Sequence, residues 1–382
     1  MRDRRVLIGV TSDISLSLMR GFPQFLRSRG WEVHVVSAPG PLLEELRGQA
    51  GITVHALPMK REPSPVADLR ALIAWVRLLR RVRPAIVSVG TPKAGLLGGL
   101  AARMTRVPAR VYHLRGLRLE TTTGVRRRVF TALERTAMAS AHTVVAVSAS
   151  LRQRALDLRL ADEARIRVLG HGSSNGVVIP AATPTPAERT ARRRELGLVD
   201  DVPIIGFVGR LTTDKGLDVL ADARSILEDR GVDHQMLIVG GVDEGAAPSI
   251  LATLRSVGRP PIETGHVPDA REYYAAMDLL CLPTLREGFP NVVLEASAAG
   301  VPTVTTDATG AVDSVVDGVT GRIAATGDPL SLADRLQELV EAGPDARGRM
   351  GDAARTRAER DFSREHVWGL FDDFLTTAAG RA

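Results

Sequence analysis

The chain has 382 residues, of which 44% are hydrophobic, which is enough to bury an ample core and to form two domains. Its one cysteine, Cys281, lies in the apolar run Leu279–Leu282, so the sequence offers no disulfide framework and no soft metal site. No apolar run approaches the ~20 residues of a membrane-spanning helix, and the charged residues 1–5 lead directly into an apolar run without a signal peptide. These features predict a cytoplasmic protein.

Charge is unevenly distributed along the chain. Residues 1–180 contain 29 Lys and Arg against 12 Asp and Glu, a net +17, whereas the remainder contains 21 against 32, a net −11. A genomic preference for arginine would raise both halves alike, so the first half is predicted to meet an anionic surface or acceptor. Nucleic acid is disfavoured as that partner, because aromatic residues are only 4% and no nucleic-acid-binding motif occurs.

The first half alternates short apolar runs with amphipathic stretches, which is typical of a parallel sheet covered by helices on both faces. Seven strands are predicted: Val6–Val10, Glu32–Val36, Ile52–Leu57, Ala85–Val89, Arg110–His113, Thr143–Val147 and Ile166–Leu169. The first crossover helix is predicted from Ser17 to Arg29, where Gly30 ends it. The loop before it contains Ser12 and Ser15, whose hydroxyls and amides could contact a ligand; a plain connector is the alternative.

Two later loops of this half carry cations. The loop Gly90–Gly95 contains Lys93 and precedes a helix, but it lacks the spacing of a Walker motif or of a dinucleotide fingerprint, so nucleotide binding is not predicted there. After the strand that ends at His113, Arg115 and Arg118 enter the next loop. Because side chains alternate along a strand, His113 and Arg115 share one face, and either could reach a ligand. The alternative is that His113 is a core histidine.

A change of composition after Asn175 and Gly176 marks the domain boundary. The segment Ile179–Pro186 contains three prolines and is predicted to be a linker. The second α/β series has predicted strands at Ile204–Val208, Met236–Val239, Leu279–Leu282, Thr303–Thr305 and Gly321–Ala324. The last helix, Ser363–Ala379, has an apolar face formed by Val367, Leu370, Phe371, Phe374 and Leu375. The predicted domains are residues 1–178 together with 363–382, and residues 179–362.

A pair of cations follows the first strand of the second series. Arg210 and Lys215 come after the strand that ends at Val208, in a loop that begins another helix. Two cations beside a helix start suit a diphosphate. A lysine that only decorated the surface would be better placed at the other end of a helix, because it opposes the dipole at the amino end. The loop is therefore predicted to bind an anion.

The segment Arg286–Glu295 holds two carboxylates around a Gly-Phe-Pro-Asn turn. The buried strand Leu279–Leu282 precedes it, and a helix is predicted to begin at Asn291. The turn then lies at the carboxyl end of a strand, where open α/β sheets bind ligands, and the amides at the helix start would accept phosphate or sugar oxygens. Glu287 and Glu295 could grip different parts of one ligand. The alternative is that both carboxylates are simply solvated.

These motifs resemble those of the retaining glycosyltransferases of family four. The stretch from Glu287 to Glu295 is similar to the E-x7-E signature in the variant E-G-F-P-N-V-V-L-E-A. Further similar segments lie in order between residues 110 and 325: Val147-Ser148 with Leu151-Arg152, Gly170–Val177, Val208–Leu211 with Asp214–Gly216, and His266–Asp269. Within the family, the sequence most resembles bacterial enzymes of lipid-linked oligosaccharide, capsule or exopolysaccharide assembly.

The resemblance implies an α/β protein with the GT-B fold: two Rossmann-like parallel-sheet domains, an interdomain cleft, and a C-terminal helix that crosses back to the first domain. It implies that the first domain binds the acceptor and the second the nucleotide sugar. The implied donor-binding residues are Arg210, Lys215, Val267, Glu287, Gly288, Phe289, Pro290, Asn291, Val292 and Glu295. The implied acceptor-side residues are Ser12, Ser15, Lys93, Arg115 and Arg118.

The resemblance also implies individual roles. Arg210 and Lys215 would bind the diphosphate and stabilise it as the leaving group, Glu287 would hold the sugar, and Glu295 would hold the ribose hydroxyls. Relatives commonly have a His-Gly pair where this sequence has Arg115-Gly116, and His113 lies two residues earlier. The implied catalytic residues are therefore Glu287, Arg210, Lys215 and either His113 or Arg115.

The predicted reaction is a metal-independent, retaining transfer of a hexose or N-acetylhexosamine to a glycan or a lipid-diphosphate-linked acceptor. The sequence contains no D-x-D motif and no clustered His, Cys and Asp residues. Fixed cations and helix dipoles would then neutralise the leaving group without a cofactor. By the resemblance, attack occurs on the front face of the donor, so the second carboxylate is not assigned as a nucleophile. UDP is preferred to GDP by analogy with the similar bacterial enzymes.

A lipid-linked acceptor would place the protein peripherally at the inner leaflet of the bacterial membrane. The segment from Arg115 to Arg135 is the predicted contact, because it carries the arginines Arg126, Arg127, Arg128 and Arg135. Three alternatives remain open from the sequence: a nucleotide-sugar 2-epimerase of the same fold, a transferase acting on a soluble small-molecule acceptor, and a non-catalytic scaffold at the membrane.

Overall fold

The computed structural model describes residues 4–60, 64–199, 201–242 and 247–380, which form two compact units. Unit 1 comprises residues 1–175 and 364–382, and unit 2 comprises residues 176–363. The sequence analysis places the corresponding boundaries after residues 178 and 362. Each unit has its own parallel sheet, as predicted.

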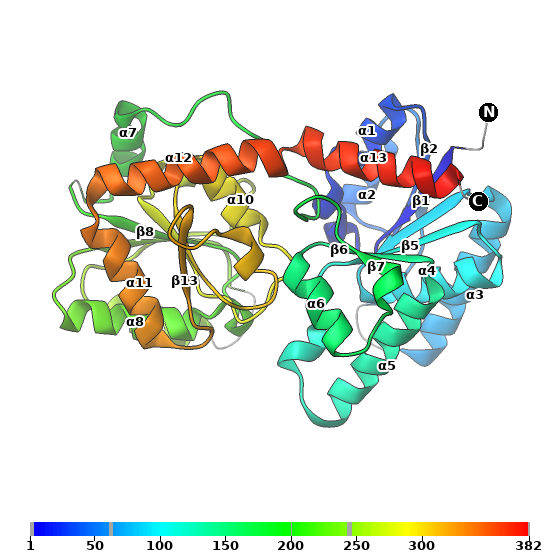
Figure 1. Ribbon diagram of the computed structural model, residues 1–382, viewed down its shortest axis with the longest axis horizontal. Coiled ribbons are helices and arrows are strands. Elements are labelled where there is room, and N and C mark those ends of the chain that lie inside the picture. The colour runs from blue at the N-terminus through cyan, green and yellow to red at the C-terminus, as the bar shows by residue number, and fades with distance from the viewer. Residues whose placement is uncertain (1–3, 61–63, 200, 243–246, 381–382) are drawn as a thin grey trace. The chain divides into compact units, whose positions relative to one another are not determined.

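Within the described residues, unit 1 is built on a seven-stranded parallel sheet in the order β3-β2-β1-β4-β5-β6-β7 (Figure 1). Its strands are β1 Arg5–Gly9, β2 Glu32–Ser37, β3 Ile52–Ala56, β4 Ile86–Gly90, β5 Ala109–Leu114, β6 Thr143–Ala146 and β7 Ile166–Arg167. Every predicted strand is present, with ends within two residues of the prediction. The strand order reverses between β1 and β4, so the connections after these two strands leave in opposite directions and their carboxyl ends form a switch point.

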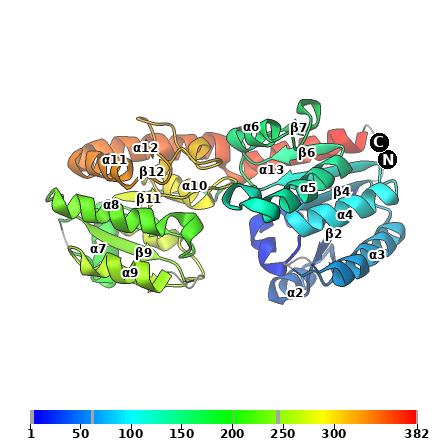
Figure 2. The ribbon, with the colours of Figure 1, turned by 90° about the horizontal axis from the view of Figure 1, so that it is seen from below.

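Helices cover both faces of this sheet. They are α1 Phe22–Ser28, α2 Pro41–Arg47, α3 Pro65–Val82, α4 Pro92–Met104, α5 Gly124–Ser140, α6 Ala149–Asp157 and α13 Arg364–Gly380, with the 3-10 segments η1 Asp13–Met19, η2 Arg118–Thr121 and η3 Glu163–Arg165. Figure 2 shows α3, α4 and α5 side by side on one face. Val6 and Ile8 pack into the core beneath α1, α2 and α13, whereas Gly9 meets Trp75 of α3 on the other face. This alternation follows from the period of two along β1.

The first crossover differs from the prediction of one helix from Ser17 to Arg29. It consists of η1 and α1, separated by Gly21 at φ 88°. A Cβ at Gly21 would lie 2.7 Å from the indole ring of Trp368 in α13, so both the left-handed backbone and the close packing require glycine here. The contact with a helix 347 residues later in the chain could not be predicted from the local pattern.

The closing helix α13 belongs to unit 1, which confirms the predicted return of the chain to its first domain. Val367, Phe371 and Leu375 are buried in the core of unit 1. The indole of Trp31 donates a 2.7 Å hydrogen bond to the buried carboxylate of Asp372, which fixes the helix against the start of β2. The preceding helix, α12 Gly343–Phe362, belongs to unit 2.

In the part of the chain that the structure describes, unit 2 has a six-stranded parallel sheet in the order β10-β9-β8-β11-β12-β13. Its strands are β8 Ile204–Val208, β9 Gln235–Val239, β10 Ile262–Gly265, β11 Leu279–Leu282, β12 Thr303–Thr306 and β13 Gly321–Ala324. The edge strand β10 is not among the predicted strands, because it contains Glu263 and Thr264 and lacks an apolar run. The order reverses between β8 and β11.

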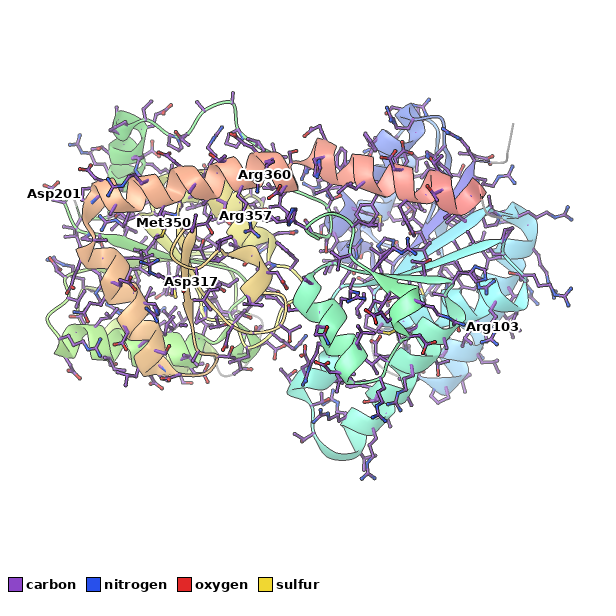
Figure 3. The ribbon with its side chains drawn as sticks, in the orientation of Figure 1. Arg103, Asp201, Asp317, Met350, Arg357 and Arg360 are labelled. Carbon is purple, nitrogen blue, oxygen red and sulfur yellow. The ribbon has the colours of Figure 1, made fainter. Side chains whose placement is uncertain are left out.

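The helices of unit 2 are α7 Pro186–Leu196, α8 Leu217–Asp229, α9 Ala247–Ser256, α10 Asn291–Ala298, α11 Pro329–Glu341 and α12, with the 3-10 segments η4 Thr213–Lys215, η5 Arg271–Ala276 and η6 Val312–Ser314. Met350 of α12 packs against the core, and Arg357 donates 2.7 Å hydrogen bonds to two carbonyls of η6 (Figure 3). The ring of Phe362 at the end of α12 lies 5.2 Å from that of Phe289. The long helix therefore supports the turn that precedes α10. Among the described residues, no helix combines the length and apolarity needed to cross a bilayer.

Candidate active site

Two loops meet at the switch point of unit 2. One follows β8 and leads through η4 into α8, and the other follows β11 and leads into α10. Because β8 and β11 are neighbours with a parallel register, their carboxyl ends lie at the same edge of the sheet. The first loop carries Arg210 and Lys215, and the second carries Glu287. This is the edge at which open α/β sheets bind ligands.

Two ion pairs join these loops. The ammonium of Lys215 donates a hydrogen bond to Glu287 Oε1, and the guanidinium of Arg286 donates to Asp214 Oδ2. Each loop contributes two consecutive residues of opposite charge, so the two pairs lie next to each other. The side chains of Lys215 and Glu287 are only 20% and 14% exposed, which shields their attraction from solvent screening. The structure thus brings together two of the predicted catalytic residues.

The backbone holds the same loops at a fixed separation. The carbonyl of Asp214 accepts hydrogen bonds from the amide of Leu285 and from the hydroxyl of Thr284, both at 3.0 Å. Gly216 has φ 68°, and a Cβ on it would lie 1.9 Å from the carbonyl oxygen of Pro283. Only glycine permits this approach. The loop after β8 is therefore pinned directly to the end of β11.

A third segment, after β12, supports Glu287 from the other side. The amide of Glu287 donates a 2.8 Å hydrogen bond to the carbonyl of Thr309. Gly310 has φ 78°, and a Cβ there would lie 2.4 Å from the carbonyl oxygen of Gly288. The hydroxyl of Thr306 donates to the carbonyl of Thr284 at 2.6 Å. The backbone of Glu287 is thus fixed before any ligand binds.

The turn from Gly288 to Pro290 is buried and leads into α10. Pro290 is the N-cap residue and no side chain caps the helix, so Asn291, its first residue, is not a capping residue. Asn291 Oδ1 is buried and has no hydrogen-bond partner. Val292, the next residue, is half-buried. The first amides of α10 have no intrahelical acceptors, as at every helix start, so this end of the helix can bind an anionic or hydroxylated group.

Glu295 lies one turn into α10 and contacts a different element. The hydroxyl of the buried Tyr274 donates a 3.0 Å hydrogen bond to Glu295 Oε2. Burial, together with the charge of Glu295, raises the pKa of Tyr274 well above its usual value, so the phenol remains a donor. Glu295 and Tyr274 border a hollow of about 500 Å³ with Asp269, Arg271 and the segment 178–184. A nucleoside would fit in a hollow of this size.

The remaining donor-side candidates lie on the same unit. Arg210 is exposed to solvent directly after Gly209. Val267 is half-buried after β10 and packs against the core beside the loop that carries Asp269. The guanidinium of Arg271 forms an ion pair with Asp269 at 2.5 Å, and this pair closes one end of the hollow next to Glu295.

In unit 1, the loops after β1 and β4 meet at the switch point. The hydroxyl of Thr91 accepts a 2.9 Å hydrogen bond from the amide of Thr11, and the hydroxyl of Thr11 accepts a 3.0 Å bond from the amide of Ala94. These bonds join the two loops that contain Ser12 and Lys93. Ser12 is half-buried next to η1.

The acceptor-side candidates differ in solvent exposure and in their contacts with other side chains of the protein. Ser15 is half-buried within η1, and Arg118 is exposed at the start of η2, where its guanidinium lies 5.6 Å from the ring centre of Phe130. Lys93 forms a 2.8 Å ion pair with Asp68 of α3, and its side chain is only 11% exposed. The ammonium of Lys93 therefore links α4 to α3 in this structure.

His113 and Arg115 lie on the same face of β5 and its extension, as the period of two predicts, and both border a small cavity of about 20 Å³. The imidazole of His113 contacts the hydroxyl of Ser88 through Nε2 at 2.7 Å, whereas its buried Nδ1 has no partner. Burial, together with the nearby charge of Arg115, lowers the pKa of His113 to about 3, so the ring is neutral at neutral pH. Burial also lowers the pKa of Arg115, to about 10, so this side chain keeps its charge.

The sequence analysis does not identify three side chains that hold these candidates. Asp214 and Arg286 precede Lys215 and Glu287 and carry the opposite charge to the residue that follows each, a pattern that could have signalled paired loops. Tyr274 lies in the pair Tyr273-Tyr274 before β11, where an aromatic residue is expected to be core. No local pattern indicates that its hydroxyl contacts Glu295.

Comparisons with known proteins agree with this architecture. Residues 202–342 match the family described as Glycosyl transferases group 1, and residues 24–172 match the Glycosyl transferase 4-like domain. The chain is 35% identical over 386 residues to the capsular polysaccharide biosynthesis glycosyltransferase CapM of Staphylococcus aureus, with 100% of both chains covered. Among solved structures, a glycosyltransferase from Rickettsia africae ESF-5 superposes with a TM-score of 0.81 at 21% identity, with 100% of both chains covered. Anabaena Alr3699/HepE in complex with UDP and glucose superposes with a TM-score of 0.78 at 20% identity, covering 99% of this chain and 100% of that one.

Two Rossmann-like units with a closing helix that returns to the first, and with paired charges at the carboxyl edge of the second sheet, define a glycosyltransferase of the GT-B fold. The chain belongs to the group 1 glycosyl transferases, which confirms the family indicated by its motifs.

Proposed function

We propose that this glycosyltransferase moves a hexose or N-acetylhexosamine from a UDP-sugar to a glycan or lipid-diphosphate-linked acceptor, with retention of configuration and without a metal ion. The observation that carries the proposal is the Lys215–Glu287 ion pair beside the start of α10. The pair sets a cation for phosphate and a carboxylate for sugar hydroxyls at one edge of the sheet.

The donor would occupy unit 2 from its switch point to the hollow beside α10. Lys215 and the exposed Arg210 are the cations available to a diphosphate, and the first amides of α10 add partial positive charge. Glu295 accepts a hydrogen bond from Tyr274 and borders a hollow large enough for the nucleoside, so its carboxylate is assigned to the ribose hydroxyls. UDP is preferred over GDP because Anabaena HepE, which has the same fold, is complexed with UDP and glucose.

Metal independence rests on the same cations. A leaving diphosphate needs positive charge that is in place before the bond breaks, and Lys215 is held there by loops that are pinned through their backbones. Retention is proposed from the family resemblance, with the leaving phosphate taking the acceptor proton. Glu287, whose Oε1 pairs with Lys215 in the protein alone, is assigned to the sugar hydroxyls, and by the family resemblance it is not assigned as a nucleophile.

The acceptor is proposed from unit 1 and from the relative in capsule assembly. CapM is a capsular polysaccharide biosynthesis glycosyltransferase, which supports a glycan acceptor here, and the lipid diphosphate is proposed from the family resemblance. Arg115 is a half-buried cation of unit 1 that keeps its charge, and it borders the same cavity as the neutral His113. We assign Arg115 to an anionic group of the acceptor or donor and His113 to support of that position.

The surface of α5 favours contact with an anionic membrane. Val125, Val129 and Leu133 are spaced by four residues and are 74%, 46% and 36% exposed. The exposed arginines Arg126, Arg127, Arg128 and Arg135 lie around this apolar line. Apolar residues flanked by arginines are typical of helices that lie in the headgroup region of a bilayer. This pattern supports a peripheral position at an anionic leaflet.

The test is to incubate the protein with labelled UDP-sugars and GDP-sugars, with and without a lipid-diphosphate glycan. Label transferred to the acceptor from a UDP-sugar, at the same rate with and without a chelator, is the expected result. The anomeric configuration of the product, determined by NMR, tests retention. Isomerised nucleotide sugar would favour the 2-epimerase alternative, and transfer only to a soluble acceptor would remove the lipid acceptor from the proposal.

A further inference from the structure

The Asp214–Arg286 ion pair lies directly beside the Lys215–Glu287 pair, but its residues have no assigned role in donor binding. Arg286 donates to the Asp214 carboxylate, with side chains 23% and 38% exposed. Asp214 lies within η4, one residue before Lys215, and Arg286 lies one residue before Glu287. Each partner is therefore covalently adjacent to a residue proposed to contact the donor.

Without Arg286, the Asp214 carboxylate would create an electrostatic problem for the site. A carboxylate next to Lys215 can repel an incoming diphosphate or compete with it for the ammonium. Arg286 donates to that carboxylate and so offsets its charge. The hydrogen bonds that the Asp214 carbonyl accepts from Thr284 and Leu285 hold the loops together, but they do not offset the negative charge of the Asp214 carboxylate.

The pair also differs from its neighbour in what happens when the donor binds. Lys215 and Glu287 must exchange each other for phosphate and sugar, so their direct link between the loops is lost in the complex. Asp214 and Arg286 need not change partners. Their ion pair is then a side-chain charge link that remains between the loops after β8 and β11.

We propose that Asp214 and Arg286 are positioning residues, which keep Lys215 available to the diphosphate and keep the loops after β8 and β11 in register while the donor is bound. This inference rests on the proposed donor site. The alternative is that Arg286 binds the phosphate directly. Asp214 would then compete with the donor for Arg286, and its removal would tighten donor binding.

The experiment is a double-mutant cycle with Asp214→Asn, Arg286→Met and the double variant, measured as kcat and KM for transfer and as the Kd for UDP by calorimetry. Arg286→Met is expected to lower kcat/KM for the donor about tenfold, because it removes the link between the loops and leaves the Asp214 carboxylate beside Lys215. Asp214→Asn should lower it less, because it removes only the link. The double variant should lose no more than Arg286→Met, because both substitutions remove the same interaction. The exchanged pair Asp214→Arg with Arg286→Asp should recover part of the loss, which a merely misfolded loop would not.

Arg230→Met is the matched control, because Arg230 forms a 2.8 Å ion pair with Asp334 between α8 and α11, away from the loops after β8 and β11. It should leave kcat, KM and Kd unchanged. Melting temperatures of all variants identify any loss of folding, and Arg286→Lys, which keeps the charge, provides a milder substitution. Tighter UDP binding by Asp214→Asn, or losses that multiply in the double variant, would overturn the inference. Absence of UDP binding by the wild-type protein would instead overturn the proposed donor site itself.

Discussion

Lys215, after β8, and Glu287, after β11, form an ion pair across 72 residues of sequence. Each is a candidate ligand for one part of the same donor: the ammonium for the diphosphate and the carboxylate for the sugar. In the protein alone they satisfy each other. In the proposed donor complex, two new interactions replace this ion pair, and the exchange links recognition of the leaving group to recognition of the sugar.

A first prediction follows for Glu287→Gln. When UDP without a sugar binds Lys215, the ion pair breaks and the Glu287 carboxylate loses its partner. In the variant the side chain at this position is a neutral amide, so no unpaired charge is left. Calorimetry should therefore show UDP binding to the variant several-fold more tightly than to the wild type. Transfer should fall by about a hundredfold or more, because the contact with the sugar is lost. Weaker binding of UDP by the variant would mean that the carboxylate does not compete for Lys215.

A second prediction concerns Lys215→Ala. If the ammonium stabilises the charge that develops on the leaving diphosphate, kcat should fall by about a hundredfold or more. KM for the acceptor should change little. Lys60→Ala is the control, because Lys60 is exposed in unit 1 and its replacement removes the same positive charge. Turnover close to that of the wild type in the Lys215 variant would exclude this residue from the leaving-group site.

A third prediction separates Glu295 from Lys215. Contacts with the ribose are much the same in the ground and transition states, so Glu295→Ala should raise the Kd for UDP and the donor KM with little change in kcat. Tyr274→Phe should have a smaller effect in the same direction, because it removes only the hydrogen bond to Glu295 Oε2. A defect confined to kcat in the Glu295 variant would contradict this role.

A fourth prediction concerns the pH dependence of stability. Burial raises the pKa of Glu134 from 4.5 to about 7, and the hydroxyl of Tyr112 donates to its carboxylate at 2.9 Å. Between these two pH values the unfolded chain has released the proton and the folded protein keeps it, so this residue makes the free energy of unfolding fall as the pH rises. Glu134→Gln removes that dependence. Urea unfolding at pH 4.5, 5.5 and 7 should show the variant gaining up to about 3 kcal/mol relative to the wild type across this range. Parallel curves for the two proteins would place the titration elsewhere.

A fifth prediction tests the membrane surface of α5. Reversing Arg126, Arg127 and Arg128 to Glu should weaken binding to anionic vesicles by about a hundredfold or more, since each arginine near the surface contributes about 1 kcal/mol. Raising the salt concentration should weaken binding of the wild type in the same way. Activity on a short, soluble acceptor should survive. The control reverses three exposed arginines of unit 2, Arg194, Arg335 and Arg349, and changes the net charge equally. Equal losses in both triple variants, or equal binding of the wild type to neutral vesicles, would contradict a specific surface on α5.

The parallel α/β architecture of both units, and the strands on which the site is built, could be predicted from local patterns in the sequence. Apolar runs such as Leu279–Leu282 define strands that are buried on both faces, and they can be recognised because the pattern is local. The motifs also indicated Lys215, Glu287 and Glu295, because each lies in a short, continuous stretch of sequence between a strand and the following helix or in the first turns of that helix. The edge strand β10 was missed because one polar face leaves no apolar run.

Tertiary structure alone decided which charges meet. Lys215 pairs with Glu287, and Asp214 with Arg286, because β8 and β11 are neighbours in the sheet although β9 and β10 separate them in the chain. Helix packing has the same effect. Lys93 forms an ion pair with Asp68 of α3, and the predicted helix from Ser17 to Arg29 is interrupted where Gly21 contacts Trp368. Strand order and helix packing depend on the whole core, whereas sequence patterns report only the neighbours of a residue along the chain.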